Sequence, residues 1–425
     1  MIVFKFGGAS INSPERIKNT ANIISSHASQ KCLVVISAMG KTTNALEKVA
    51  DSYFEGRQTE ALALFEKVKQ AHLETIKFLL VKNWREAEEN VGNIFTEVEW
   101  LLHDKPVRPF DYYYDQIVCS GELLSSAIAS AYLKEIGIPN TWLDVRDILK
   151  TDSNFRDAAI QWDVTRELCE ADLIPLWKES NVIITQGFIG STNENESTTL
   201  GREGSDYTAA IFANLLNAEG VTIWKDVEAV MNADPRIYSK AVPIPELSYR
   251  EVIEMAYYGA QVIHPKTIKP LQNAGIPLYV KSFLDPSLQG TTISERSSKA
   301  LPPVIVIKQN QVLLNFRTID YSFMEGTPVD ILHQLFGNLR IKSNLSQHTA
   351  ISLIACFDEH PEKIPALAES AAGHFEVNLE RNLTLLTIRH YTGEILNELL
   401  AGKDIILQQR TPETLQVVMR DQFTT

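Results

Sequence analysis

The sequence has few cysteines, no surplus of basic residues and no long apolar runs. Its 4 cysteines among 425 residues stand far apart, so neither a zinc-ligand spacing nor a disulfide framework is present. The formal net charge of −13 argues against the basic face that nucleic-acid binding needs. No signal peptide is recognisable, and no apolar run approaches the length of a membrane span. These absences predict a cytoplasmic protein that binds neither nucleic acid nor membrane.

The sequence also lacks the Walker spacing of a P-loop, so any phosphate must be held in another way. Ile2–Phe6 is predicted to be a buried strand, and Gly7 and Gly8 follow it directly. Lys5 lies inside this strand, where its charge is costly to bury unless an anion such as a bound phosphate pairs with it. The alternative is an edge-strand lysine whose amine reaches solvent.

A second glycine-flanked stretch, Thr198–Tyr207, precedes an apolar run at Thr208–Leu216 that predicts a helix. Ser205 and Asp206 fall where helix N-caps belong, so free backbone N–H groups would meet an anion there. Arg202 adds a forked cation suited to a carboxylate or a phosphate. The alternative is a tight surface turn followed by a capped helix.

Strands and helices alternate over the first two thirds of the chain, which predicts a mostly parallel sheet covered on both faces. The predicted strands are short apolar runs: Val3–Phe6, Cys32–Ser37, Asn140–Asp144, Val182–Phe188, Val221–Asp226 and Pro277–Ser282. The predicted helical segments are Pro14–Ser26, Leu46–His103 (a charged stretch outside the sheet), Asp115–Ile136, Tyr249–Tyr257 and Pro265–Ala274.

A domain boundary is predicted near Ser294–Pro303, where serines and two prolines are typical of a linker. The remaining chain fits two small α+β units. Its predicted strands are Val304–Ile307, Gln311–Phe316, Ile351–Ala355, Leu383–Ile388, Ile405–Gln408 and Leu415–Met419, and its predicted helices are Pro328–Leu335, Pro361–Ala372 and Glu394–Leu400. This tail contains no glycine-rich phosphate loop, which favours a regulatory or dimerising role over chemistry.

Motifs in one consistent order resemble those of the aspartokinase family within the amino-acid kinase fold. They are Lys5-Phe6-Gly7-Gly8-Ala9-Ser10 (with Ala9 where threonine is usual), Ser37-Ala38-Met39-Gly40 with Thr43-Asn44, Ser120-Gly121-Glu122, Gly201-Arg202-Glu203-Gly204-Ser205-Asp206-Tyr207, Trp224-Lys225-Asp226-Val227 with Ala233-Asp234-Pro235-Arg236, and Gly259-Ala260-Gln261-Val262-Ile263-His264-Pro265. Each motif alone is weak evidence, but the ordered set covers almost the whole chain and is highly specific.

The resemblance implies an α/β catalytic domain over residues 1–295, with a mostly parallel sheet sandwiched by helices. It implies a regulatory region over residues 303–425, made of two small ferredoxin-like ACT modules. The implied reaction phosphorylates the side-chain carboxylate of L-aspartate with ATP to give 4-phospho-L-aspartate, the first step towards lysine, threonine and methionine. Mg²⁺ would be bound mainly through ATP oxygens and water rather than by a protein cage.

The resemblance assigns catalysis to Lys5, which would bridge the attacking carboxylate and the transferring phosphoryl group. Asp206 would hold Lys5 in position, and Gly7 and Gly8 would offer backbone N–H donors to the phosphates of ATP. Because the attacking carboxylate is already ionised at neutral pH, no strong general base is required. Catalysis would then consist of aligning two anions and neutralising their repulsion.

The resemblance also assigns the contacts to L-aspartate. Arg202, with support from the Ser205 N–H, would bind the α-carboxylate, and Glu122 would bind the α-ammonium. Thr43 would donate its hydroxyl to a substrate carboxylate. From the residues alone, Glu122 could equally be an anion that favours a helix N-terminus, and Thr43 could be an ordinary helix cap.

The nucleotide site departs from the family pattern. Asp226 would follow a strand, where ligands gather in open α/β sheets, and Arg236 would pair with phosphate oxygens unless it forms only a surface salt bridge. Lys225 stands where threonine is frequent, Met231 where tyrosine is frequent and Gln261 where lysine is usual. We expect Lys225 to make the phosphate contact that Gln261 cannot, and Met231 to pack on adenine.

The tail suggests an effector site and subunit contacts. Family members of this type bind lysine or threonine between ACT modules of paired subunits, so a homodimer or higher homo-oligomer is expected. The corresponding contacts here would be Tyr321, Met324, Thr327 and Asn344. Asn344 stands where some lysine-sensitive relatives carry an aspartate, which puts the effector in question. The alternative is a dimerisation platform that binds no ligand.

Two other functions remain open from the sequence. The same fold could phosphorylate glutamate or N-acetylglutamate, although Arg202 with Glu122 favours a substrate with a free amine and a free α-carboxylate. A non-catalytic amino-acid sensor is the third possibility. The presence of Lys5, Glu122, Arg202 and Asp206 together argues against it, because a sensor has no need of all four.

Overall fold

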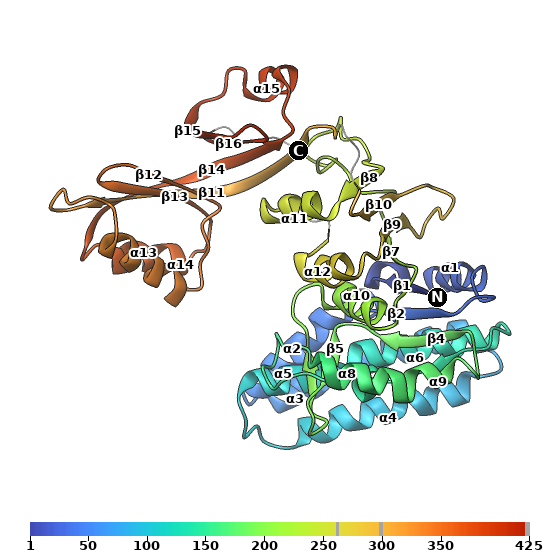
Figure 1. Cartoon of the computed structure of the whole chain (residues 1–425). Helices are drawn as coiled ribbons and strands as arrows, with labels where there is room; N and C mark the ends of the chain where they lie inside the picture. The colour runs from blue at the N-terminus through green and yellow to red at the C-terminus, as the bar shows by residue number, and fades with distance from the viewer. Residues whose placement is uncertain (261–262, 297–300, 421–425) are drawn as a thin grey trace. The chain divides into compact units, whose positions relative to one another are not determined.

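The computed structural model describes residues 1–260, 263–296 and 301–420. They belong to two compact units (Figure 1). The first comprises Met1–Val230, Pro245–Ile253 and Val262–Ser298, and the second comprises Met231–Ile244, Glu254–Gln261 and Lys299–Thr425. Two short stretches before the predicted boundary therefore belong to the second unit. No helix within the described ranges is long and apolar enough to cross a bilayer.

The first unit is built on an eight-stranded sheet in the order β3-β4-β2-β1-β7-β9-β10-β8. Neighbouring strands run parallel, except for β9 and β10, which are antiparallel. The strand bounds are β1 (Ile2–Phe6), β2 (Cys32–Ile36), β3 (Thr141–Trp142), β4 (Val182–Gln186), β7 (Gly220–Lys225), β8 (Glu246–Ser248), β9 (Leu278–Ser282) and β10 (Thr291–Ser294). β5 (Ile189–Ser191) and β6 (Ser197–Thr199) form a separate antiparallel pair.

Strand β1 lies inside this sheet, between β2 and β7. Lys5 is in register with Val35 on one side and with Ile223 on the other. Because side chains alternate along a strand, Phe4 and Phe6 point to one face and Lys5 points to the opposite face. The alternative of an edge-strand lysine is therefore wrong, and the Lys5 charge needs a partner within the structure.

Helices cover both faces of the sheet (Figure 1). The core on the Phe4 and Phe6 side includes α1 (Pro14–Ser25), α3 (Gln58–Leu79), α4 (Trp84–His103) and α6 (Ser120–Glu135). On the Lys5 side, α10 (Gly204–Leu215) lies against β1, β2 and β7, and α12 (Pro265–Ala274) packs on α10. The remaining helices are α2 (Thr42–Phe54), α5 (Phe110–Val118), α7 (Val145–Ile148), α8 (Trp162–Leu168), α9 (Ile174–Leu176) and α11 (Tyr249–Tyr257), with short turns η1 (Gly8–Ile11) and η2 (Cys169–Leu173).

Two predicted helical segments are divided in the structure. The charged stretch Leu46–His103 consists of α2, α3 and α4, and the predicted helix Asp115–Ile136 consists of α5 and α6, which meet at Cys119. At this junction the Ser120 hydroxyl donates to the Ile117 carbonyl oxygen at 2.7 Å. Such local side-chain bonds compete with the regular helical ladder, which accounts for the interruption.

The second unit contains a six-stranded antiparallel sheet in the order β12-β13-β11-β14-β16-β15. Its elements are β11 (Val304–Thr318), α13 (Thr327–Asn338), β12 (Leu345–His348), β13 (Ser352–Asp358), α14 (Lys363–Ala371), β14 (Phe375–Arg389), α15 (Gly393–Leu400), β15 (Ile405–Arg410) and β16 (Thr414–Met419). The two predicted α+β units share this sheet, because β11 and β14 run through both. α13 and α14 pack over one part of it, and α15 packs over another.

Candidate active site

A cavity of about 550 Å³ lies on the Lys5 face of the first unit, at the carboxyl ends of β1 and β7. Predicted site residues from separate motifs line it together: Lys5, Gly8, Thr43, Glu122, Arg202, Ser205, Asp206 and Lys225. The other lining residues include Glu47, Tyr114, Arg156, Phe188 and Thr199. The fold thus brings predicted site residues from five segments of the sequence to one cavity.

The partner of the Lys5 ammonium is the Asp206 carboxylate in the first turn of α10. Nζ of Lys5 lies 2.7 Å from Oδ1 of Asp206, and the two side chains are 12% and 5% exposed. Burial would raise the pKa of Asp206, but the nearby charges of Lys5 and Lys225 outweigh it and hold that pKa below its usual value. Asp206 is therefore ionised at neutral pH and fixes the ammonium at the cavity.

The glycine pair after β1 leaves room around this ammonium. A Cβ on Gly7 would lie 3.3 Å from Nζ of Lys5, and a Cβ on Gly8 would lie 2.7 Å from the Ala38 carbonyl oxygen. The Gly40 N–H also donates to the Gly8 carbonyl oxygen at 3.1 Å. The backbones that follow β1 and β2 therefore approach each other beside the cavity, and a side chain at Gly8 would separate them.

Glu122 brings a buried carboxyl group to the same cavity from the first turn of α6. The residue is 3% exposed, and its Oε1 accepts a hydrogen bond from the Ala38 N–H at 3.3 Å. Its Oε2 has no hydrogen-bond partner among the described residues. Burial raises the pKa of Glu122 to about 8. A buried carboxyl group with an unused oxygen suits the binding of a cation.

The start of α10 differs from the prediction. The helix begins at Gly204 with Glu203 at the N-cap position, in a left-handed conformation with φ of 55°, so the prediction of Ser205 and Asp206 at the N-cap was wrong. Both lie within the first turn, and Asp206 is thereby directed at Lys5. A Cβ on Gly187 would lie only 2.5 Å from Cβ of Ser205. This close approach fixes the start of α10 beside the end of β4.

Several residues at the cavity were not predicted from the sequence. They include Arg156 and Thr199. Both are held by Asp115, which is fully buried and accepts hydrogen bonds from the Arg156 N–H at 2.9 Å and from the Thr199 N–H and hydroxyl at 2.9 and 2.7 Å. Burial raises the pKa of Asp115 to about 6. No local pattern marks Asp115, because its partners Arg156 and Thr199 lie 41 and 84 positions away in the sequence.

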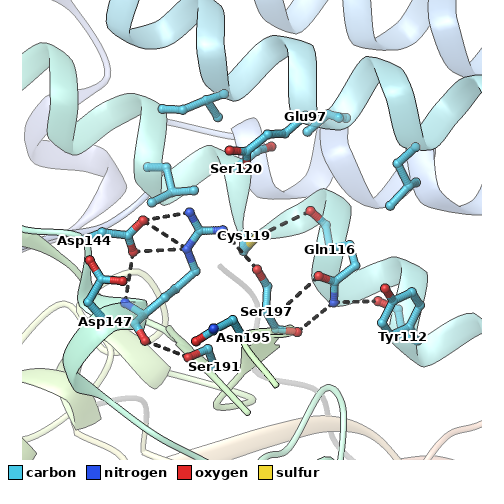
Figure 2. Close-up of a pocket in the computed structure, with 15 residues that line it drawn as sticks. Glu97, Tyr112, Gln116, Cys119, Ser120, Asp144, Asp147, Ser191, Asn195 and Ser197 are labelled. Carbon is cyan, nitrogen blue, oxygen red and sulfur yellow. Dashed lines mark hydrogen bonds and ion pairs between the residues drawn. The ribbon is translucent and has the colours of Figure 1, made fainter. Parts of the chain in front are cut away.

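A second cavity, of about 380 Å³, lies beside the α5–α6 junction (Figure 2). Its polar lining is already engaged in internal contacts. Gln116 bonds to the backbone of Ser197 in both directions, and the Arg146 guanidinium pairs with Asp144 at 2.7 Å and donates to the Ser197 hydroxyl at 3.1 Å. These contacts hold β6 against α5, and β6 leads directly into the segment that carries Arg202.

The predicted nucleotide residues do not all lie in one unit. Asp226 is exposed directly after β7, and Lys225 lines the first cavity. Met231 and Arg236 belong to the second unit, where the Arg236 side chain is 83% exposed and pairs with Asp234 at 2.7 Å. Gln261 lies outside the described residues. The roles of these residues at a nucleotide stay predictions.

The predicted effector residues have different environments within the second unit. Met324 is 2% exposed and packs in the core under α13 and α14, and its role as an effector contact stays a prediction. Tyr321 is 69% exposed, and Thr327 is the first residue of α13. The Asn344 amide donates to Gln311 and Asp358 at 2.8 and 3.1 Å, and its oxygen accepts from Lys308 at 2.8 Å.

Comparison with known proteins agrees with this arrangement. The amino acid kinase family model matches residues 1–282. Lysine-sensitive aspartokinase 3 of Escherichia coli (strain K12) is 33% identical over 342 residues, which cover 80% of this chain and 73% of that protein.

Solved structures of aspartokinase III from E. coli share the fold of both units. The complex with aspartate and ADP (R-state) superposes with a TM-score of 0.82 at 27% identity, covering 99% of this chain and 96% of that chain. The complex with lysine and aspartate (T-state) gives a TM-score of 0.83 at 27% identity, covering 98% and 95%. The predicted fold class and the family resemblance are confirmed. The chain therefore belongs to the amino acid kinase family and, within it, to the aspartokinases.

Proposed function

We propose that this chain transfers the γ-phosphoryl group of ATP to the side-chain carboxylate of L-aspartate, giving 4-phospho-L-aspartate and ADP. The observation that carries the proposal is the buried Lys5–Asp206 ion pair in a cavity that also presents the unpaired Glu122 oxygen and Arg202. The related enzyme from E. coli has been solved with aspartate and ADP, which supports the same pair of ligands here.

The chemical task is to bring two anions together. An oxygen of the substrate carboxylate forms a bond to the γ-phosphorus while the bond between that phosphorus and the bridging oxygen to the β-phosphate breaks. No proton has to leave the nucleophile, because a carboxylate is ionised at neutral pH. The Lys5 ammonium lowers the repulsion between the two reactants, and Asp206 keeps it at the cavity before substrates arrive.

The remaining groups account for recognition of the amino acid. Arg202, with the Ser205 N–H, binds the α-carboxylate, Glu122 binds the α-ammonium, and Thr43 donates to a carboxylate oxygen. The buried Oε2 of Glu122 gains a charged donor from a free ammonium but only a single neutral N–H from an acetylated amine. This argues against N-acetylglutamate as the substrate. A kinase of glutamate would use the same contacts, so the choice between aspartate and glutamate depends on the test below.

The nucleotide is bound through backbone N–H groups of Gly7 and Gly8 and through the Lys225 ammonium at the cavity. Among residues 1–260, 263–296 and 301–420, no group of three or more His, Cys, Asp or Glu side chains converges as a metal site. Because the Asp206 carboxylate is already engaged by Lys5, this donor set fits Mg²⁺ carried by ATP oxygens and water. Such an ion would neutralise phosphate charge.

Residues 303–425 form the regulatory region in this proposal, and residues 1–295 form the catalytic domain. The lysine-bound structure of the E. coli relative supports lysine as a candidate effector, with threonine as the alternative. We infer a homo-oligomer formed through the C-terminal modules, and a place at the first step towards lysine, threonine and methionine. Asn344 is already bonded within its own sheet, so an effector amine would have to compete with Lys308 for its oxygen.

A coupled assay of ADP release across L-aspartate, L-glutamate and N-acetyl-L-glutamate tests the function. We expect turnover with L-aspartate, and loss of that turnover in Lys5→Met, which keeps the length of the apolar stem but removes the charge. Turnover with L-glutamate instead would contradict the substrate assignment. ADP release with none of the three, while L-aspartate still binds by calorimetry, would favour the sensor.

A further inference from the structure

Arg156 lines the active-site cavity, although no motif in the sequence points to it. It lies within the loop 151–160, which is closed by its own hydrogen bonds. The Asp152 carboxylate accepts from the N–H groups of Asn154 and Ala159 at 3.1 and 2.9 Å, and the Asp152 N–H donates to the Ala159 carbonyl oxygen at 3.0 Å. The loop therefore presents Arg156 in a defined position.

The backbone of Arg156 is strained and is held by the buried Asp115 carboxylate. Its φ is 69°, in the left-handed region that residues with a Cβ disfavour. Its N–H donates to Oδ2 of Asp115 at 2.9 Å, and the same oxygen accepts the Thr199 N–H at 2.9 Å. Asp115 thus joins the loop to β6. Backbone strain that the surroundings impose in this way is characteristic of functional positions.

Strand β6 is also held by the neighbouring residue of α5, at the second cavity. Gln116 follows Asp115 in α5, and its amide donates to the Ser197 carbonyl oxygen at 2.8 Å and accepts from the Ser197 N–H at 3.1 Å. Figure 2 shows this pair in the wall of the second cavity. Consecutive residues of α5 therefore hold β6 at Ser197 and at Thr199. Arg156 cannot move far unless this strand moves with it.

The loop of Arg156 touches the segment that carries Arg202. The Arg156 carbonyl oxygen and the Asp157 Oδ1 lie 3.3 and 2.8 Å from where a Cβ on Gly201 would be. The Ala158 N–H also donates to the Thr199 carbonyl oxygen at 3.0 Å. Gly201 directly precedes Arg202 in the sequence. Two loops in backbone contact thus each bring a guanidinium-bearing residue to one cavity.

The Arg156 side chain is oriented by an aromatic ring and only loosely paired. Its guanidinium carbon lies 4.3 Å from the Tyr114 ring centroid and 5.6 Å from that of Phe110. Its Nη1 pairs with Oδ1 of Asp111 at 3.0 Å, and the two side chains are 46% and 55% exposed. An exposed pair of this kind contributes little to stability, so a substrate carboxylate could replace Asp111 while the ring contact remains.

We propose that Arg156 is a second guanidinium for the α-carboxylate of L-aspartate, acting with Arg202, and that it helps to set specificity for a substrate with this carboxylate. This inference rests on the proposed function. Lys5 is paired with Asp206 and faces the reacting groups, which leaves the guanidinium groups for the non-reacting carboxylate. In this view Asp111 pairs with the Arg156 guanidinium in the free enzyme, and the substrate carboxylate replaces Asp111 on binding.

Arg156→Gly is the informative variant, because glycine adopts a φ of 69° without strain while the guanidinium is removed. We expect the KM for L-aspartate to rise about tenfold or more, as for loss of a charged hydrogen bond, with kcat within about twofold and the KM for ATP unchanged. β-Alanine keeps the amine and the reacting carboxylate but lacks the α-carboxylate. Its inhibition constant against L-aspartate should therefore be the same in wild type and variant.

Asp111→Asn is the matched control, since it releases Arg156 without removing it. We expect it to lower the KM for L-aspartate, with a Tm within about 2 °C of wild type. An unchanged KM in Arg156→Gly would overturn the inference and leave the proposed function standing. Equal rises in the KM for L-aspartate and in the β-alanine inhibition constant would also overturn it, because they would indicate a displaced loop. A wild-type enzyme inactive on L-aspartate would refute the proposed function and this inference with it.

Discussion

The buried carboxyl group of Glu122 predicts how the binding of L-aspartate depends on pH. Burial raises the pKa of Glu122 to about 8, so the group is protonated in the free enzyme at neutral pH. Only the ionised form attracts the substrate ammonium, and binding must therefore release a proton. At pH 7 this ionisation costs about 1.4 kcal/mol, which corresponds to a roughly tenfold higher KM than above pH 8, with another tenfold at pH 6.

The measurement is the KM for L-aspartate at saturating ATP between pH 6 and 9, followed by coupled ADP release. Calorimetric titrations in two buffers of different ionisation enthalpy would count the released proton directly. Glu122→Gln is the control, because its amide has nearly the same shape but does not titrate. Its KM should be high and independent of pH. A wild-type KM that stays constant from pH 6 to pH 8 would refute the reasoning.

The same group makes a prediction about stability. Between its ordinary pKa of 4.5 and its native value of about 8, Glu122 holds a proton in the folded state but not in the unfolded state. The free energy of unfolding therefore falls as pH rises through this window. Glu122→Gln abolishes this effect, so its Tm should rise relative to that of wild type from pH 6 to pH 8, and the difference should level off above pH 8. Parallel Tm curves would mean that the native pKa is not raised.

Other substitutions give further tests. Lys5→Met should reduce kcat for L-aspartate by at least about 10²-fold, measured as ADP release, whereas retained activity would exclude the ammonium from catalysis. Lys225→Ala should raise the KM for ATP, and an unchanged value would refute its phosphate contact. Gly187→Ala should cost about 1–3 kcal/mol in urea unfolding, because its Cβ would meet Ser205 at 2.5 Å. Met324→Ala should destabilise the second unit by about 2–5 kcal/mol, and full stability would contradict a packing role for Met324.

Many elements follow from local sequence. The bounds of α11 at Tyr249–Tyr257 and of α12 at Pro265–Ala274 agree with the prediction. In α12, Pro265 stands at the first helical position and Gly275 ends the helix in a left-handed conformation, so both ends carry local signals. Strands such as β2 are equally predictable from the sequence, because a short, fully apolar run is typical of a central parallel strand.

Elements that depend on distant partners were predicted less well. Only Leu383–Ile388 of β14 was predicted as strand, because Phe375–Arg389 begins with a partly exposed, polar half. That half is a strand because it pairs with β11. The start of α10 was also misplaced, because a left-handed Glu203 supplies the turn and no local capping pattern marks it. Glutamate rarely adopts that conformation without support from elsewhere in the structure.

The sequence by itself determined the family, the order of the elements and the main charged groups, because glycine loops, capped helices and apolar strands act through neighbouring residues. It singled out Lys5, Glu122, Arg202 and Asp206. Only the tertiary structure decided that Lys5 meets Asp206 at 2.7 Å and that burial leaves Glu122 with an unused oxygen. It alone revealed Arg156, since the backbone N–H of that residue is held by Asp115, 41 positions away in the sequence.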